Sequence, residues 1–311
     1  MDEILDFFRG KEARRSRRAF SRVGWAMTAF LALQVAAQYP LLFLVQALAP
    51  QWLDYPATAY LLAAAATYGV AFPASLLILR SLPGRAPERR ERLRPAALAS
   101  LWLLCMGTVY LSNMVGLWLV DGLGAALGHE IQDPVDSMGE LPLGVGVLVS
   151  CILAPVAEEL LFRKGLIDRL RGWGEGFAAV ASALLFALAH GNIYQIPYAF
   201  AVGFVLGAIY LRTGRVGCTV LLHGGVNMVS ALLLPLSRRL GEPGTLALAL
   251  LVLWAIAWAI SWVFGRRQIL ARELPRAGWG DGETWGHFLV NPGATLFILA
   301  ALWVVVRYLS L

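Results

Sequence analysis

Two carboxylates and two histidines of this sequence lie within long apolar runs, where ionisable side chains are rare. Glu158 and Glu159 are adjacent in one run, and His190 and His223 lie in two others. A charged group near the centre of a bilayer is costly, so such residues usually face the protein interior and mark a functional site. The alternative is that they only join helices by hydrogen bonds or ion pairs, which is less favoured for four residues than for one.

Helical spacing separates the two carboxylates. Glu159 and Arg163 are four residues apart, so they face the same side of a helix and are expected to form an ion pair. Glu158 is rotated by about 100° from its neighbour, has no partner in its own helix and is free to face other helices. Pro155 removes a backbone hydrogen bond just before it and is expected to kink the helix.

A second spacing of four residues brings a histidine and an amide together. His223 and Asn227 lie on one helix face. Gly224 and Gly225, which lie between them, allow another backbone or a substrate to approach closely.

These residue types could together hydrolyse an acyl bond. A carboxylate and an imidazole that share one water, such as Glu158 and His190, form a general-base pair. A histidine and an amide, such as His223 and Asn227, offer hydrogen bonds to a developing oxyanion. The sequence contains neither G-x-S-x-G nor H-E-x-x-H. Glu158, His190 and His223 could also hold a divalent metal, so metal-free and metal-dependent mechanisms both stay open.

The elements that position these residues are predicted to be membrane-spanning helices. Hydrophobic residues make up 59% of the 311 residues and charged residues 15%, whereas a soluble domain is about one quarter charged. A span needs roughly 20 apolar residues, and continuous apolar runs favour helices over a β-barrel. The predicted fold is an all-α polytopic integral membrane bundle of eight to nine helices. The nine runs are 23–48, 57–79, 95–120, 143–167, 176–190, 195–211, 217–236, 245–264 and 292–310.

The basic residues indicate the orientation of the chain. The net charge is +6, which alone could suggest a nucleic-acid or anionic-lipid partner. If the N-terminus is cytoplasmic and the spans alternate, 23 of the 26 Lys and Arg residues fall on the cytoplasmic side. That distribution follows the positive-inside rule. It favours a cytoplasmic N-terminus and a role of the charges in topology, and it argues against nucleic acid.

Residue counts along the helices predict the depth of the site. At 1.5 Å per residue, Glu158 and His190 both lie roughly 22–26 Å from the turn at Trp173, so an antiparallel hairpin puts them level. His223 lies about 13 Å from its own cytoplasmic turn. It reaches the same depth if the two helices of the hairpin around Trp173 project ~10 Å beyond the membrane. The site is then expected in the cytoplasmic half. Residues 191–194 must form an irregular segment buried in protein.

Three motifs, read together, resemble those of the CPBP family, which comprises CAAX prenyl endopeptidases and bacteriocin-processing or immunity membrane proteins. The resemblance covers roughly residues 145–235. It divides the chain into a basic cytoplasmic or interfacial segment (1–22), N-terminal transmembrane helices (23–142), a catalytic helical core (143–236) and C-terminal transmembrane helices (237–311). The motifs are Glu158-Glu159-x-x-x-Arg163, Phe186-x-x-x-His190 and His223-x-x-x-Asn227.

The resemblance implies roles for the motif residues. Glu158 and His190 would activate the water, His223 with Asn227 would stabilise the oxyanion, and the ion pair of the first motif would fix the site. The family's peptidases look like glutamate-dependent enzymes, although metalloprotease assignments persist. All motif positions match here, which argues against an inactive member.

The sequence therefore predicts an intramembrane endopeptidase that acts on a membrane-anchored protein or peptide in the lipid bilayer, with no cofactor assigned unless a divalent metal is bound. One alternative is a non-proteolytic protein of the same fold, such as an immunity or scaffolding factor that binds a partner's transmembrane segment. A transporter or proton relay is disfavoured because no interrupted helices occur in matching halves.

The Ala-, Leu- and Arg-rich composition resembles that of a GC-rich bacterium. It favours the inner membrane, and cleavage of a leader or sorting segment rather than of a prenylated peptide.

Overall fold

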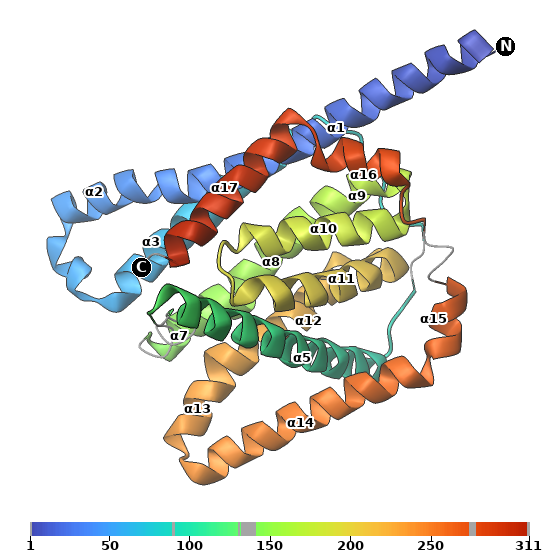
Figure 1. Cartoon of the computed structure of the whole chain (residues 1–311). Helices are drawn as coiled ribbons and strands as arrows, with labels where there is room; N and C mark the ends of the chain where they lie inside the picture. The colour runs from blue at the N-terminus through green and yellow to red at the C-terminus, as the bar shows by residue number, and fades with distance from the viewer. Residues whose placement is uncertain (1, 89–90, 130, 132–140, 274–277, 310–311) are drawn as a thin grey trace.

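The chain is built of helices, with no strand, over the residues that the computed structural model describes, which are 2–88, 91–129, 131, 141–273 and 278–309 (Figure 1). Within these residues eight helical stretches are long and apolar enough to cross a bilayer. They form the polytopic all-α membrane bundle that the sequence predicts. The remaining apolar run, 176–190, forms α10 (Glu175–Ala189), whose 15 residues fall short of a span. The spans are Glu12–Leu48, Pro56–Arg80, Pro95–Leu127, Leu143–Trp173, Gln195–Thr213, Val216–Arg239, Glu242–Gly265 and Pro292–Leu309.

Several spans consist of successive α and π segments rather than one regular α-helix. In chain order the other elements are α1 (Asp2–Ala36), α2 (Gln38–Leu48), the short 3-10 helix η1 (Pro50–Asp54), α3 (Pro56–Ala64), the π segment η2 (Ala65–Ala71), α4 (Phe72–Arg80), α5 (Pro95–Leu127), α7 (Leu143–Gly146), the π segment η3 (Val147–Leu153), α8 (Ala154–Glu158), the π segment η4 (Glu159–Ile167), α9 (Asp168–Leu170), the 3-10 turn η5 (Arg171–Trp173), α11 (Gln195–Thr213), α12 (Val216–Met228), the π segment η6 (Val229–Leu233), α13 (Leu234–Arg239), α14 (Glu242–Gly265), α15 (Arg267–Glu273), α16 (Gly282–Leu289) and α17 (Pro292–Leu309).

The helices pack in two groups around the central hairpin of η4 and α10. On one side α10 packs against α11, α11 against α5, and α5 against α14. On the other side α1 packs against α4 and α17, so the first and last helices lie side by side (Figure 1). The segments that carry the polar residues of interest are therefore enclosed by helices from both ends of the chain.

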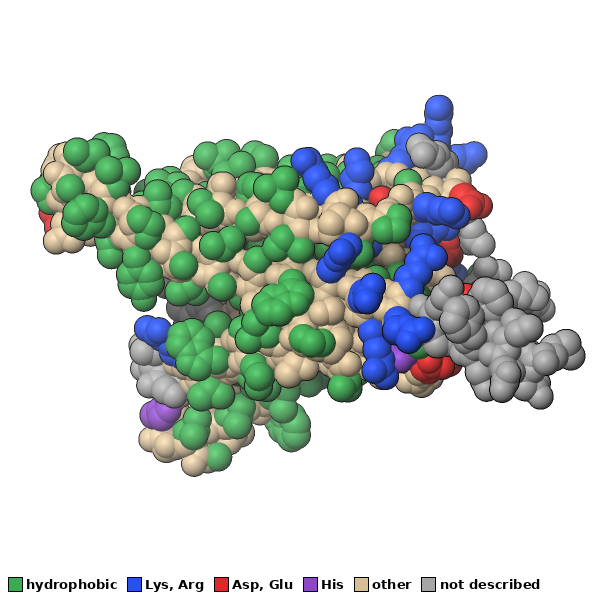
Figure 2. All heavy atoms as spheres, turned by 90° about the horizontal axis from the view of Figure 1, so that it is seen from above, with side chains coloured by type: hydrophobic (Ala, Val, Ile, Leu, Met, Phe, Trp, Pro, Cys, Tyr) green, Lys and Arg blue, Asp and Glu red, His purple; other side chains and the backbone are tan. Residues whose placement is uncertain are grey.

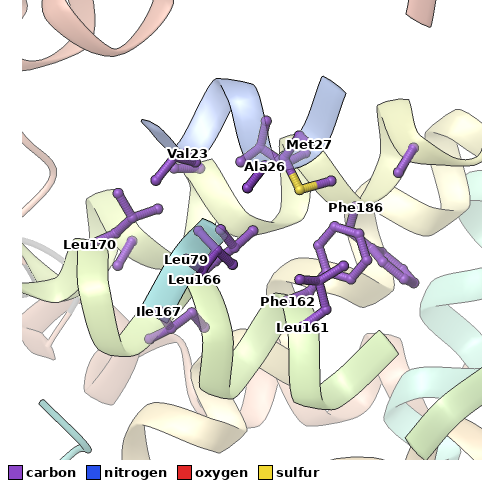
Figure 3. Packing of buried hydrophobic residues seen from close by; sticks show 14 of the residues in the cluster. Val23, Ala26, Met27, Leu79, Leu161, Phe162, Leu166, Ile167, Leu170 and Phe186 are labelled. Carbon is purple, nitrogen blue, oxygen red and sulfur yellow. The ribbon is translucent and has the colours of Figure 1, made fainter. Parts of the chain in front are cut away.

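The main apolar core lies where α1 crosses η4 and α10. Val23 and Met27 of α1 lie on one side of this cluster, Leu79 of α4 and Leu166 of η4 lie on the other, and Phe162 and Phe186 complete it (Figure 3). The two phenylalanine rings meet edge to face with their centroids 5.0 Å apart. Phe186 precedes His190 by one helical turn, so this core fixes the helix end that carries the histidine.

Two boundaries differ from those expected. α1 continues through residues 22 and 23 without a break, so the basic segment 1–22 and the first apolar run form one helix. The reason is that no proline or glycine cap separates them. α5 extends to Leu127 instead of ending near residue 120, and Gly128, in the left-handed conformation with φ 77°, ends it.

The predicted irregular segment between α10 and α11 is present at residues 191–194. Gly191 has a φ of 67°, and a Cβ at this position would collide with Val304 of α17. Oδ1 of Asn192 accepts a hydrogen bond of 2.9 Å from the N–H of Gln195, at the start of α11. The segment is thus packed against α17 and satisfies part of its own backbone, as non-helical chain at membrane depth must.

Three of the π segments end directly before an X-Pro junction. In each case the residue before the proline donates its N–H to the carbonyl five residues earlier, not four. A proline ring clashes with the carbonyl four residues before it, and a wider turn moves that carbonyl away. The proline therefore gives a physical reason for the change of register, which the sequence marks only as a kink before Glu158. The junctions are Phe72-Pro73, Ala154-Pro155 and Leu234-Pro235.

Helices α1 and α17 approach each other at glycines. A Cβ on Gly293 would overlap the carbonyl of Ser21 and the N–H of Trp25, and a Cβ on Gly24 would overlap the backbone of Gly293. Small residues allow membrane helices to come into backbone contact, where van der Waals packing replaces the missing hydrophobic drive.

We expect Gly293→Ala to lower the stability of the protein by about 1–3 kcal/mol, because the new methyl group overpacks the contact with α1. Thermal unfolding in one detergent measures the effect. Gly286→Ala is the matched control, since a Cβ there meets nothing within 4 Å, and this change should be neutral or slightly stabilising. Equal melting temperatures for the two variants would contradict the proposed close contact.

Candidate active site

A fully buried ion pair lies at the centre of the bundle. Nε of Arg163 is 3.0 Å from Oε2 of Glu159, and neither side chain is exposed. Nη1 of Arg163 lies 3.5 Å from Oγ of Ser182 on α10, and its guanidinium lies 4.8 Å from the centroid of the Phe186 ring. Opposite charge offsets part of the loss of water that burial of an ion costs. Oε2 of Glu159 and Nε and Nη2 of Arg163 have no hydrogen-bond partner among the described residues, so the pair is held mainly by charge.

His223 connects this ion pair to the second carboxylate. Its Nδ1 is 3.0 Å from Oε1 of Glu159, and its Nε2 is 3.8 Å from Oε2 of Glu158. An ionised carboxylate only accepts, so Nδ1 carries the proton of the shorter contact. The longer distance exceeds that of a direct hydrogen bond and suits a bridging water. The sequence did not predict that one imidazole lies between both carboxylates.

Glu158 is the carboxylate that remains accessible. Its side chain is 17% exposed, whereas that of Glu159 is fully enclosed. The hydroxyl of Tyr68 donates a hydrogen bond of 3.3 Å to Oε1 of Glu158. One residue of helical rotation therefore puts the two neighbouring carboxylates in different surroundings.

His190 ends α10 with one ring nitrogen engaged. Its Nδ1 lies 2.7 Å from the carbonyl oxygen of Phe186, which can only accept, so Nδ1 donates. In the neutral imidazole Nε2 is then an acceptor. The Phe186 ring meets His190 and His223 edge to face, with centroids 4.7 and 5.8 Å away. The Phe186 ring thus lies between the two imidazoles and places them in one region of the bundle.

Asn227 has a partner that the sequence did not suggest. Its Nδ2 donates a hydrogen bond of 2.8 Å to the carbonyl of Ser150. In this π segment the N–H of Ala154 donates to the carbonyl of Val149, five residues earlier. In the same register the carbonyl of Ser150 would accept from the N–H of residue 155. That residue is Pro155, which has no N–H. The amide of Asn227 replaces the missing donor and retains a second N–H.

The glycines beside Asn227 allow two close approaches. A Cβ on Gly224 would meet the carbonyl of Cys151 in η3, and one on Gly225 would meet the Trp102 indole. The close approach that the sequence predicts at these positions is therefore made by protein, and α12 can lie directly against the helix that carries Glu158.

Two tyrosines contact this region although sequence analysis did not single them out. Tyr68 bonds Glu158 as described, and Tyr60 lies 2.7 Å, hydroxyl to hydroxyl, from Ser150. Both belong to the span Pro56–Arg80, and each contact joins residues 90 positions apart. A tyrosine inside an apolar helix is the only signal, and spacing within the span does not reveal its partner.

The donor set does not form a preformed metal site. Within the described part of the chain, no three His, Cys, Asp or Glu side chains converge closely enough to hold a metal ion. Glu158, His190 and His223 therefore do not fit a three-ligand centre as they lie. We derive no chemical step through a metal.

We expect Asn227→Ala to lower stability by about 1–3 kcal/mol, because it leaves the carbonyl of the buried Ser150 without a donor. Pro155→Ala restores a backbone N–H. In that background the loss of Asn227 should therefore cost clearly less, which a double-mutant cycle of unfolding free energies measures. Strictly additive effects would show that the amide does not stand in for the proline's missing donor.

Comparison with known proteins gives matches over the same region. Residues 141–229 match the family model of type II CAAX prenyl endopeptidases, Rce1-like. The chain is 26% identical over 152 residues to YdiL of Bacillus subtilis (strain 168), provisionally named a membrane peptidase, with 48% of this chain and 61% of YdiL covered. It is 32% identical over 79 residues to the membrane-embedded CAAX protease MroQ of Staphylococcus aureus (strain USA300), with 23% and 32% covered. It is 28% identical over 95 residues to YxdF of Lactococcus lactis (strain IL1403), with 30% and 52% covered.

These matches are partial, since the chain spans less than two thirds of the length of each relative. No solved structure matches the chain significantly. The family model nevertheless covers all three motifs, and it coincides with the helices that meet around the buried ion pair. The chain therefore contains an Rce1-like region and is similar to proteins named as membrane peptidases, in agreement with its resemblance to the CPBP family.

Proposed function

We propose that this chain is an intramembrane endopeptidase that hydrolyses a peptide bond in a membrane-anchored protein or peptide, using a water activated by Glu158 and His190. The observation that carries the proposal is the contrast between the two carboxylates. Glu159 is enclosed and engaged by Arg163, whereas Glu158 is partly exposed and lies 3.8 Å from Nε2 of His223. A carboxylate and an imidazole with free acceptor atoms are the groups that general-base catalysis needs.

In the proposed reaction the water lies between Glu158 and Nε2 of His190. Glu158 takes a proton from the water as its oxygen attacks the carbonyl carbon. The carbonyl oxygen becomes an oxyanion, which accepts hydrogen bonds from the second N–H of Asn227 and from Nε2–H of His223. In this step His223 carries a proton on both ring nitrogens, so that Nδ1–H still donates to Glu159. The C–N bond then breaks, and the leaving amine receives the proton held by Glu158.

The buried ion pair has a positioning role in this proposal. Glu159 accepts from Nδ1 of His223, so it fixes the ring orientation that directs Nε2 toward Glu158. Arg163 neutralises Glu159 and is itself held at Ser182 and Phe186. Catalytic groups need such support because a small misplacement costs a large part of the rate.

We further propose the setting of the reaction. Two relatives carry the names of a membrane peptidase and a CAAX protease, which supports a membrane-anchored peptide as the substrate. The distribution of arginines along the chain supports a site in the cytoplasmic half of the membrane. The Ala-, Leu- and Arg-rich composition supports a bacterial inner membrane and a leader or sorting segment as the cleaved region.

We expect Glu158→Gln to reduce peptide release by about 10²- to 10⁴-fold, because the isosteric amide cannot accept the proton of the water. The measurement compares peptides released from total membranes that contain the wild type or the variant. His190→Ala should lose the same products. Glu242→Gln, a change of one exposed acid at the start of α14, serves as the control and should retain them.

Two arms make this experiment decisive. An unchanged peptide profile in folded Glu158→Gln and His190→Ala proteins would refute the peptidase proposal and favour a non-proteolytic partner-binding role. A chelator added to the wild-type membranes tests whether the water is activated without a metal ion. Products that disappear with chelator and return with a divalent cation would show that a metal takes part.

We expect Tyr68→Phe to lower kcat about tenfold with little change in KM, because it removes the hydroxyl that holds Glu158 in place. Tyr60→Phe removes a hydroxyl from the same helix that faces Ser150 instead, so it should leave kcat close to wild type. An effect of equal size in both variants would mean that the span Pro56–Arg80 acts only through packing.

A further inference from the structure

A large cavity lies at one end of the bundle, away from the buried ion pair. Its volume is about 1070 Å³. It is lined by α1, by the connection that follows α4, by the turn at residues 168–173 and by α16. None of these lining residues belongs to the three motifs, so the cavity is separate from the candidate active site.

Arginines dominate the wall that α1 provides. Arg14, Arg18 and Arg22 are four residues apart and form a stripe along one face of the helix. Arg15 and Arg85 also line the cavity, and all five side chains are exposed. Among the ion pairs of the described residues, none involves any of these five. Figure 2 shows the arginine and lysine side chains gathered toward this end of the molecule, beside the apolar surface.

Three of the five acidic residues that line the cavity have partners within the protein. Asp168 accepts a hydrogen bond of 2.8 Å from the hydroxyl of Tyr210, and Asp281 accepts one of 2.8 Å from the N–H of Thr284 at the start of α16. Glu283 lies 3.7 Å from Nε2 of His287. Seven arginines and five carboxylates line the cavity in total, so positive charge is in excess there and an anion is favoured.

The cavity lies beside the polar ends of three helices that are apolar enough to span a membrane. Arg22 directly precedes the apolar part of α1, and the span Pro56–Arg80 and the span Leu143–Trp173 both end beside it. Trp173 itself lines the wall, and tryptophan is typical of the membrane–water interface. A ligand that enters here can keep acyl chains in the bilayer while its headgroup reaches the arginines.

We propose that this cavity binds the phosphate headgroup of an anionic phospholipid. Guanidinium groups form paired hydrogen bonds with phosphate oxygens, and basic pockets beside transmembrane helices are a known way of binding anionic headgroups. The sequence assigns these arginines only to topology. The cavity gives them a second role, which does not depend on the proposed peptidase activity.

Native mass spectrometry of the full-length protein in detergent tests this site. The protein is titrated with dioleoyl-phosphatidylglycerol and, separately, with zwitterionic dioleoyl-phosphatidylcholine. We expect Arg14→Gln combined with Arg18→Gln to weaken phosphatidylglycerol binding at least about tenfold. Arg238→Gln combined with Arg239→Gln removes two exposed charges outside the cavity and should leave binding unchanged. If the first pair impairs folding, the single change Arg85→Gln in the connection is used instead.

Three results would overturn the proposal. Equal weakening by the two arginine pairs would show that only net charge matters. Binding of phosphatidylcholine as tightly as phosphatidylglycerol would show that the headgroup charge is not recognised. Displacement of the lipid by millimolar inorganic phosphate or by an acidic peptide, with the same dependence on Arg14 and Arg18, would assign the cavity to a soluble anion.

Discussion

The central helices are arranged around the need to neutralise one buried guanidinium and one buried carboxylate. Arg163 and Glu159 have no contact with solvent, and removing one partner of such a pair typically costs about 3–5 kcal/mol. Their remaining contacts extend to Ser182 on α10 and to His223 on α12. One ion pair on η4 therefore fixes the relative position of the three helices that bring the polar residues together.

Irregular backbone is concentrated in the same region. Glu158 lies between the π segments η3 and η4, and Tyr68 lies in a third, η2. π segments are often found at functional sites. Prolines account for two of these three segments, because each removes a helical donor and displaces a carbonyl, and Asn227 compensates for one such loss. No proline follows η4, so that segment has no comparable explanation in the sequence.

Features that depend on spacing within one helix could be predicted from sequence. The proximity of Glu159 to Arg163, the different surroundings of Glu158 and the irregular turn after His190 all follow from helical periodicity, residue type and depth. Contacts between helices could not be predicted in the same way. The bonds from Tyr68 to Glu158 and from Asn227 to Ser150 depend on how distant segments pack, and π segments change the helical phase on which spacing arguments rely. The continuity of α1 across residue 22 was missed because composition changes there although the backbone does not.

The close contact between Gly191 and α17 indicates which part of this protein can fold on its own. α10 is shorter than the hydrocarbon thickness, and the non-helical backbone that follows it needs cover within the bilayer. Val304, from a helix outside the matched region 141–229, supplies part of that cover, and α1 supplies the apolar wall behind η4. The matched region is thus incomplete as a folding unit. A fragment cut to residues 141–229 would therefore uncover both surfaces, and α1 and α17 have to be kept with it.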